Sequence, residues 1–173
     1  MNTHNSPNIT VAVAVSGGVD SLCALVMLRN AGCQVLALHG LFLPDAPATA
    51  PAGLAEACAA LEVPLHVADL RAEFEREVLA PFAAAYARGR TPNPCAYCNR
   101  AIKFGVLLDT ALNFGAHKLA TGHYARRLET PQGSFILRGR DPNKDQSYFL
   151  SLMRPGQIAK AMFPLGDLLK PEV

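Results

Sequence analysis

Strand-like and helix-like patterns of apolar residues alternate along the first 121 residues. Four short apolar runs are typical of buried parallel strands, and they cover residues 9–15, 34–39, 64–68 and 118–121. Between them, apolar residues at helical spacing predict helices over residues 20–30, 54–61, 71–88 and 99–114. The third of these helices contains Pro81, which can kink it. This alternation predicts an α/β fold with a doubly wound parallel sheet.

The rest of the chain follows a different pattern. Residues 125–128 and 134–137 flank the turn-forming tripeptide at 131–133, which predicts a small β-hairpin. Two short helical patterns, at 146–153 and 156–162, predict a C-terminal helical tail. At 173 residues without an internal repeat, the chain is expected to form a single domain over residues 1–173.

Composition favours a globular domain over a disordered or membrane-spanning chain. Half of the residues are hydrophobic and 17% are charged. No apolar run reaches the roughly 18 residues of a membrane helix, and Met1–Asn8 lacks the basic residues and apolar run of a signal peptide. The odd number of cysteines, five, argues against a disulfide framework. A cytoplasmic protein without a membrane partner is expected.

The net charge of +2 conceals an uneven distribution. Residues 1–87 carry three basic and eight acidic side chains, whereas residues 88–144 carry ten basic and three acidic ones. A basic block in a nearly neutral protein indicates a polyanionic partner. Solvated loop charge explains the same block equally well, and charge alone does not separate the two.

A phosphate loop (residues 15–21, Val-Ser-Gly-Gly-Val-Asp-Ser) joins the first expected strand to the first expected helix. Its two glycines let backbone N–H groups close on an anion at the helix N-terminus. Ser16 and Ser21 add hydroxyl donors, and Asp20 can cap the helix or help to hold Mg²⁺. The loop lacks the Gly-Lys-Ser/Thr of a Walker A loop and the G-x-G-x-x-G of a dinucleotide site. An ordinary capped turn is the alternative.

A pair of cysteines, Cys95 and Cys98, follows a polar, proline-rich loop. Cys98 falls where the next helix is expected to begin. There the helix dipole, Arg100 and Lys103 would lower its thiol pKa and make it nucleophilic. Cys95 is within reach for a disulfide or a shared ligand. Half a zinc site, thioredoxin-like redox chemistry and an iron–sulfur cluster completed by Cys23, Cys33 or Cys58 are the alternatives, with the cluster not favoured.

Five ordered motifs resemble the tRNA-specific 2-thiouridylase family of PP-loop ATP pyrophosphatases. They are SGGVDS, RTPNPCAYCNRAIKFG, ATGHYARR, LRGRDPNKDQSYFL and FPLGDLLKPEV. The resemblance covers nearly the whole chain and implies a Rossmann-like, adenine nucleotide alpha-hydrolase fold. It also implies an enzyme that adenylylates the C2 oxygen of the wobble uridine of tRNA and then transfers sulfur from a persulfide.

The resemblance further implies residue roles. ATP phosphates and nucleotide would be bound by Ala14, Val15, Ser16, Gly17, Gly18, Val19, Asp20, Ser21, Gly40 and Gly122. The target base would face Asn93, Pro94 and Cys95, with Cys98 as the nucleophile that carries the persulfide and His123 next to it. The remaining tRNA contacts would come from Lys144, Asp145 and Gln146. The implied cofactors and partners are ATP, Mg²⁺, tRNA and a persulfide sulfur donor protein, with no resident metal site.

Several of these residues also have structural interpretations. A lone histidine such as His123 is more often a strand-end residue bonded to backbone. Residues 145–147 could cap the following helix, and Arg126 and Arg127 could be hairpin surface charge.

The chain departs from the family at two places. A Pro/Ala-rich loop at 44–53 replaces a longer acidic segment. The chain also ends before the second catalytic cysteine and the tRNA-binding domains of the family, so a fragment of a longer protein is expected; otherwise Cys95 would be the second thiol. Two other functions stay open: a degenerate PP-loop module that binds nucleotide or RNA, and a PP-loop sulfurtransferase with another substrate.

Overall fold

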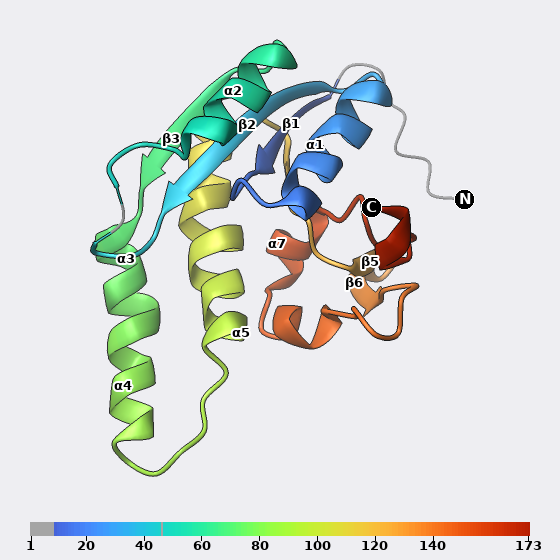
Figure 1. Cartoon of the computed structure of the whole chain (residues 1–173). Helices are drawn as coiled ribbons and strands as arrows, with labels where there is room; N and C mark the ends of the chain where they lie inside the picture. Colours follow the sequence, from blue (N-terminus) through green and yellow to red (C-terminus); the bar gives the residue numbers. More distant parts are fainter. Residues whose placement is uncertain (1–8, 46) are drawn as a thin grey trace.

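The computed structural model describes residues 9–45 and 47–173, so Met1–Asn8 and one position of the loop at 44–53 lie outside it. Five parallel strands form a sheet in the order β3-β2-β1-β4-β7 (Figure 1). Their bounds are β1 Thr10–Ala14, β2 Gln34–Leu41, β3 Leu65–Asp69, β4 Lys118–Ala120 and β7 Ala161–Met162. The predicted α/β fold with a doubly wound parallel sheet is therefore confirmed.

Alternate residues of β1 pack into two separate hydrophobic cores, one on each face of the sheet. Val11 and Val13 point into the core shared with helices α1 (Val19–Asn30) and α2 (Ala52–Ala60). Ala12 points to the opposite face of the sheet, where the helix that follows the cysteine pair packs. Because both faces of the sheet are covered, the three middle residues of its central strand are buried, as its unbroken apolar run predicts.

The cysteine helix (residues 94–113) begins earlier than its apolar stripe predicts. It comprises α5 (Pro94–Cys98), a π-helical stretch η2 (Asn99–Leu107) and α6 (Leu108–Asn113), with a kink at Gly105. The expected start at residue 99 is wrong because Asn93 acts as N-cap and Pro94 as the first helical residue, a combination that starts helices. Cys98 consequently lies inside the helix rather than at its beginning.

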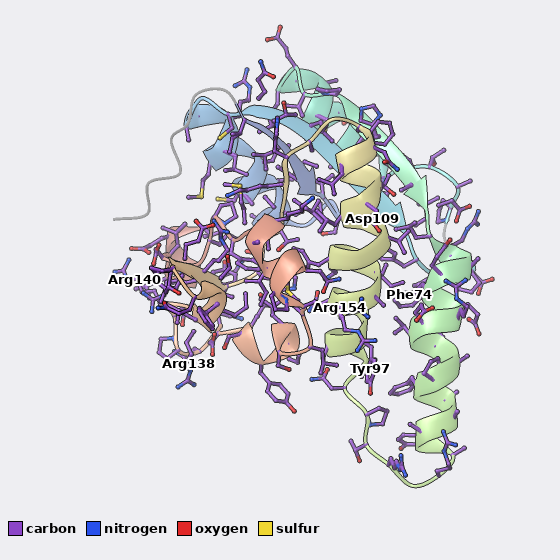
Figure 2. All side chains as sticks on the ribbon, turned by 180° about the vertical axis from the view of Figure 1, so that it is seen from behind. Phe74, Tyr97, Asp109, Arg138, Arg140 and Arg154 are labelled. Carbon is purple, nitrogen blue, oxygen red and sulfur yellow. The ribbon has the colours of Figure 1, made fainter. Side chains whose placement is uncertain are left out.

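The helix over residues 71–88 is widened rather than sharply kinked. It consists of α3 (Arg71–Phe74), the π-helix η1 (Glu75–Leu79) and α4 (Ala80–Tyr86). Pro81 has no N–H group to donate to the preceding turn, and the π-helix stands directly before it. Phe74 packs from this helix against the core beneath the cysteine helix (Figure 2).

The C-terminal part contains the predicted hairpin and a strand that was not predicted. The hairpin pairs β5 (Ala125–Thr130) with β6 (Gly133–Arg138) and is confirmed. The expected helix at 156–162 is wrong in its last two residues: α7 (Pro155–Lys160) ends and β7 extends the sheet beside β4. A strand of two residues is too short to show a period of two, which explains why the sequence pattern concealed it. The pattern at 146–153 forms only the 3-10 helix η3 (Ser147–Leu150), and η4 (Lys170–Glu172) lies near the C-terminus.

Within residues 9–45 and 47–173, every helix is too short or too polar to cross a membrane.

Candidate functional site

A cavity of about 440 Å³ opens at the carboxyl ends of β1, β2 and β4. Strand order reverses between β1 and β4, and such a switch point is the usual ligand site of an open parallel sheet. Among the residues expected to hold ATP or tRNA, those lining the cavity are Ala14, Val15, Ser16, Asp20, Ser21, Gly40, Gly122, His123 and Gln146. The structure thus brings candidate residues from four separate segments of the chain to one cavity.

The phosphate loop is closed by its own serines. Ser21 Oγ donates to the carbonyl of Gly18 at 2.8 Å and lies 3.2 Å from the backbone N of Ser16, from which it accepts. Gly17 has a φ of +86°, a left-handed conformation that glycine adopts without strain. The residues at 17–19 are exposed and belong to the loop without lining the cavity.

No side chain caps helix α1, so the proposed capping role of Asp20 is wrong. The N-cap is Gly18, and its helix makes no side-chain cap hydrogen bond. The backbone N–H groups at this helix N-terminus, at the positive end of the helix dipole, therefore have no side-chain cap, and Asp20 is the acidic residue of the first turn. This arrangement suits a phosphate group.

The carboxylate of Asp20 is instead held by two residues that sequence reasoning missed. Tyr124 donates its hydroxyl hydrogen to Oδ1 of Asp20 at 2.9 Å, and the ammonium group of Lys170 bonds the same oxygen. Burial opposes ionisation of Asp20, but these two partners hold the pKa of its carboxyl group below the usual 3.8. Both partners lie within the ATGHYARR and FPLGDLLKPEV motifs, which was the signal available in the sequence.

Gly122 makes the closest approach between the loop after β4 and the start of α1. A Cβ atom at this position would lie 2.9 Å from the carbonyl carbon of Asp20 and 3.0 Å from the backbone N of Ser21. Only glycine fits against backbone at that distance. Gly122 therefore sets how closely β4 approaches the phosphate loop.

His123 lies in the cavity wall as a neutral side chain. Its Nδ1 is 2.7 Å from Oγ1 of Thr121, and its ring packs beside Phe104 and Phe163. Burial, assisted by the charge of Lys103, lowers the pKa of His123 to about 3. The suggested bond from this histidine to backbone is wrong, since the partner is a side-chain hydroxyl. A neutral His123 supplies no positive charge to a phosphate.

The two cysteines occupy different environments on the cysteine helix. Cys95 is exposed in its first turn, and Cys98 is partly buried one turn later, packed against the core. Burial raises the pKa of the Cys98 thiol, Lys103 lowers it and Cys95 raises it, with a net increase. The expected lowering of the thiol pKa is wrong because burial disfavours the thiolate more than Lys103 favours it, and Cys98 lies inside the helix rather than at its beginning.

The three other cysteines are on the opposite side of the sheet from Cys98. Cys23, Cys33 and Cys58 belong to the core under α1 and α2, whereas Cys98 packs against the other core. In the part of the chain that the structure describes, no group of three or more His, Cys, Asp or Glu side chains could hold a metal. A three-thiolate cluster at Cys95 and Cys98 therefore lacks its third ligand among these residues. A magnesium ion needs fewer protein ligands, because it binds one or two carboxylates together with nucleotide phosphates. Asp20 lines the cavity and can supply one such carboxylate.

The residues expected to contact tRNA divide into exposed and internally bonded ones. Lys144 is exposed, and its charge helps to lower the pKa of Asp20, although Lys144 does not line the cavity. Asp145 accepts hydrogen bonds from the backbone N of Gly139 at 2.9 Å and from the hydroxyl of Ser147 at 2.9 Å. It also accepts from the backbone N of Ser147, but the 3-10 helix that follows has Gln146 as its N-cap and no side-chain cap hydrogen bond, so the capping interpretation is wrong.

Two more of these candidates are engaged inside the protein. Asn93 accepts from the backbone N of Ala96 at 3.2 Å and starts the cysteine helix, with Pro94 as its first residue. Gln146 accepts from the backbone N of Tyr124 at 2.9 Å. Both therefore fix the backbone around the site.

The hairpin arginines differ from each other. Arg127 is buried, and its Nη1 donates to the carbonyl of Ala159 at 2.9 Å, so describing it as surface charge is wrong. Arg126 is partly exposed and pairs with Asp167 at 3.7 Å. Further exposed arginines, Arg138 and Arg140, lie around the hairpin (Figure 2).

Comparisons with known proteins agree on a tRNA-modification family. Residues 9–173 match the family described as the tRNA methyl transferase HUP domain. The tRNA-specific 2-thiouridylase MnmA of Nitratidesulfovibrio vulgaris (strain DP4) is 51% identical over 166 residues, which are 95% of this chain and 48% of that protein. The protein of the same name from Akkermansia muciniphila is 49% identical over 174 residues, covering 94% of this chain and 48% of that protein. The chain spans about half the length of these curated relatives.

Among solved structures, a predicted subunit of tRNA methyltransferase from Methanocaldococcus jannaschii has a similar fold. The TM-score is 0.57 at 19% identity, and the match covers 95% of this chain and 71% of that one.

Proposed function

The chain belongs to the family of the tRNA methyl transferase HUP domain, and from that premise we propose that it is the ATP-using part of a tRNA 2-thiouridylase. In this proposal it activates the C2 oxygen of a wobble uridine with AMP and replaces it with sulfur carried by Cys98. The observation that carries the proposal is that the cysteine helix also forms a wall of the cavity. Lys103, five residues after Cys98, lines it together with Ser16 and Asp20.

Adenylylation is the step that the phosphate loop supports. The uncapped N-terminus of α1 and the hydroxyl of Ser16 would bind the ATP phosphates, and Asp20 would help to hold Mg²⁺ on them. The uridine C2 oxygen attacks the α-phosphorus, a new P–O bond forms, and the bond to pyrophosphate breaks. The base then carries AMP on C2, which turns a poor leaving group into a good one.

Sulfur transfer is assigned to Cys98. The terminal sulfur of its persulfide attacks C2, and AMP departs with the former C2 oxygen. A second thiolate then attacks the Sγ atom of Cys98, which forms a disulfide and leaves the terminal sulfur on the base. Cys95, three residues earlier and exposed, is the neighbouring thiol, and the remaining half of the relatives' length can supply another.

The matching family is named after a methyl transferase, whereas the relatives are named as thiouridylases. The cysteine pair favours sulfur chemistry over methyl transfer, because a thiol can carry a persulfide. Cys98 provides such a thiol on the helix whose Lys103 lines the cavity. Lys103 is the cation that favours the Cys98 thiolate against the effect of burial. We accordingly expect tRNA and a persulfide donor protein as partners, and residues 1–173 as one catalytic domain.

The test separates the two steps. The chain is incubated with ATP, labelled pyrophosphate and unmodified tRNA, and ATP–pyrophosphate exchange is measured. Thiolated uridine is measured by mass spectrometry after addition of a persulfide donor. We expect Cys98→Ser to retain exchange and to lose thiolation, because activation precedes attack by sulfur.

Absence of pyrophosphate release with any tRNA would contradict the proposed activity. A protein that binds ATP tightly without turnover would support the other function, a module that only binds nucleotide or RNA.

A further inference from the structure

Lys170 reaches the phosphate loop from the far end of the chain. Its ammonium group bonds Oδ1 of Asp20, 150 residues earlier in the sequence. The ammonium nitrogen also lies 5.8 Å from the centre of the Tyr124 ring, which places it over an aromatic face. Asp20 lines the cavity, so Lys170 contacts a lining residue, although it does not line the cavity itself.

The segment around Lys170 is held in place without its ammonium group. The backbone N of Lys170 donates to Oδ2 of Asp141 at 2.9 Å, and the backbone N of Leu169 donates to Glu172 at 2.6 Å. Arg140 donates to the carbonyl of Asp167 at 3.1 Å. The ammonium group is therefore not required to anchor this segment.

The ion pair itself adds little to stability. About a third of the Lys170 side chain is exposed, as is a similar share of Asp20. Exposed pairs of this kind contribute little because water screens them. Backbone contacts thus hold Lys170 next to the phosphate loop, and its ion pair adds little to the stability of the protein. This combination indicates that the ammonium group has a role in binding.

The phosphate loop lacks the lysine that a Walker A loop places on phosphates. Resting on the function proposed above, we propose that Lys170 supplies this cation: it binds the phosphates of the nucleotide, and Asp20 keeps it next to the phosphate loop until the nucleotide arrives. When Lys170 turns to the phosphates, Oδ1 of Asp20 becomes available to a magnesium ion. One carboxylate plus phosphate oxygens is a ligand set that Mg²⁺ commonly uses.

The surrounding charges are consistent with this exchange. Asp20 raises the pKa of Lys170 through a hydrogen bond, so the lysine is positively charged before nucleotide binds. Lys103 lines the cavity, and the charge of Lys144 helps to lower the pKa of Asp20, so a triphosphate bound there would meet further positive charge. The neutral His123 does not compete for the phosphates.

The test compares ATP with adenosine, which has no phosphates. Binding of each to the 173-residue chain is measured by isothermal titration calorimetry with Mg²⁺ present, for wild type, Lys170→Met, Lys170→Arg and Lys160→Met. Lys160 is an exposed lysine at the end of α7, so its substitution is a matched loss of charge outside the cavity. Thermal unfolding of every variant confirms that it is folded.

We expect Lys170→Met to weaken ATP binding about tenfold or more while leaving adenosine binding unchanged, because a charge-assisted hydrogen bond is lost. Lys170→Arg should retain most of the affinity for ATP, and Lys160→Met should match wild type. Unchanged ATP binding by Lys170→Met, or equal losses for ATP and adenosine, would overturn the phosphate role of Lys170. A wild-type chain that binds no ATP would overturn the proposed function as well.

Discussion

Asn99 ties the cysteine helix to the C-terminal part of the chain: its Nδ2 donates to the carbonyl oxygen of Phe149 at 2.9 Å. Asn99 directly follows Cys98 and is 2% exposed. Its Oδ1 is buried and has no hydrogen-bond partner among the residues that the structure describes. The donor side of this amide is thus hydrogen-bonded while its oxygen is not, and the donated bond fixes the position of the helix next to Cys98.

We expect Asn99→Ala to lower the free energy of unfolding by about 1 kcal/mol, because one hydrogen bond is lost. Asn99→Asp should lower it further, by about 3 kcal/mol, since a buried carboxylate would face the Phe149 carbonyl with no donor to satisfy it. Urea denaturation measures both, with the exposed Asn113→Ala as control. An Asp variant as stable as the Ala variant would show that this site is open to water.

The pH dependence of cysteine alkylation tests the environment of Cys98. Burial raises the pKa of this thiol, so its thiolate fraction at neutral pH is below that of an ordinary cysteine. In a Cys95→Ser background, we expect the rate of Cys98 alkylation by iodoacetamide to keep increasing to a pH above 9, the ordinary value. Peptide mass spectrometry measures the rate at each pH.

Lys103→Met should move that profile to still higher pH, because Lys103 lowers the pKa of Cys98. Arg100→Met, a matched loss of charge on the same helix, should move it less. If the alkylation rate of Cys98 instead reached its maximum near neutral pH, the thiol pKa would be lowered in the free protein, and the raised pKa would be wrong.

The stability of the protein should fall between pH 6.5 and pH 5 because of His123. Its folded pKa is about 3 and its ordinary value is 6.5, so in this range the unfolded state binds a proton that the folded state does not. The free energy of unfolding at pH 5 should therefore be about 2 kcal/mol lower than at pH 7.5 from this group.

Urea denaturation of wild type and His123→Asn at both values of pH measures the contribution of His123. The carboxyl groups with lowered pKa values titrate below this window and do not interfere. The same loss of stability in His123→Asn would assign the effect to another residue.

The sequence predicts what depends on neighbours along the chain. The strands and the phosphate loop are recognisable because a buried parallel strand, a Ser-Gly-Gly turn and a helix follow one another directly. The sequence also encodes the start of the cysteine helix, as an Asn N-cap followed by proline. The two residue types are equally typical of loops and turns, so the helix start was not recognised.

Contacts between distant segments were not predictable in this way. β7 becomes a strand only because β4 lies beside it. Lys170 meets Asp20 only because the tail folds back across 150 residues. No periodicity or local motif records such tertiary contacts, and they determine the electrostatics of the cavity.

Gly122 lies so close to the phosphate loop that even a methyl group at this position would disturb the loop. In Gly122→Ala, the new methyl group would lie 2.9 Å from the carbonyl carbon of Asp20 and must displace backbone rather than a flexible side chain. We expect the free energy of unfolding to fall by about 1–3 kcal/mol. ATP binding should weaken about tenfold or more, since the anion-binding turn is moved directly.

Gly156→Ala provides the matched control. Gly156 lies on α7, and a Cβ atom there would have no heavy atom within 4 Å. Because alanine favours helix over glycine, this variant should be unchanged or stabilised by up to about 1 kcal/mol, with wild-type ATP binding. Calorimetric titration with ATP and urea denaturation measure both variants. If Gly122→Ala bound ATP as wild type does, the loop after β4 would yield to the methyl group, and the close approach would not be required for the phosphate site.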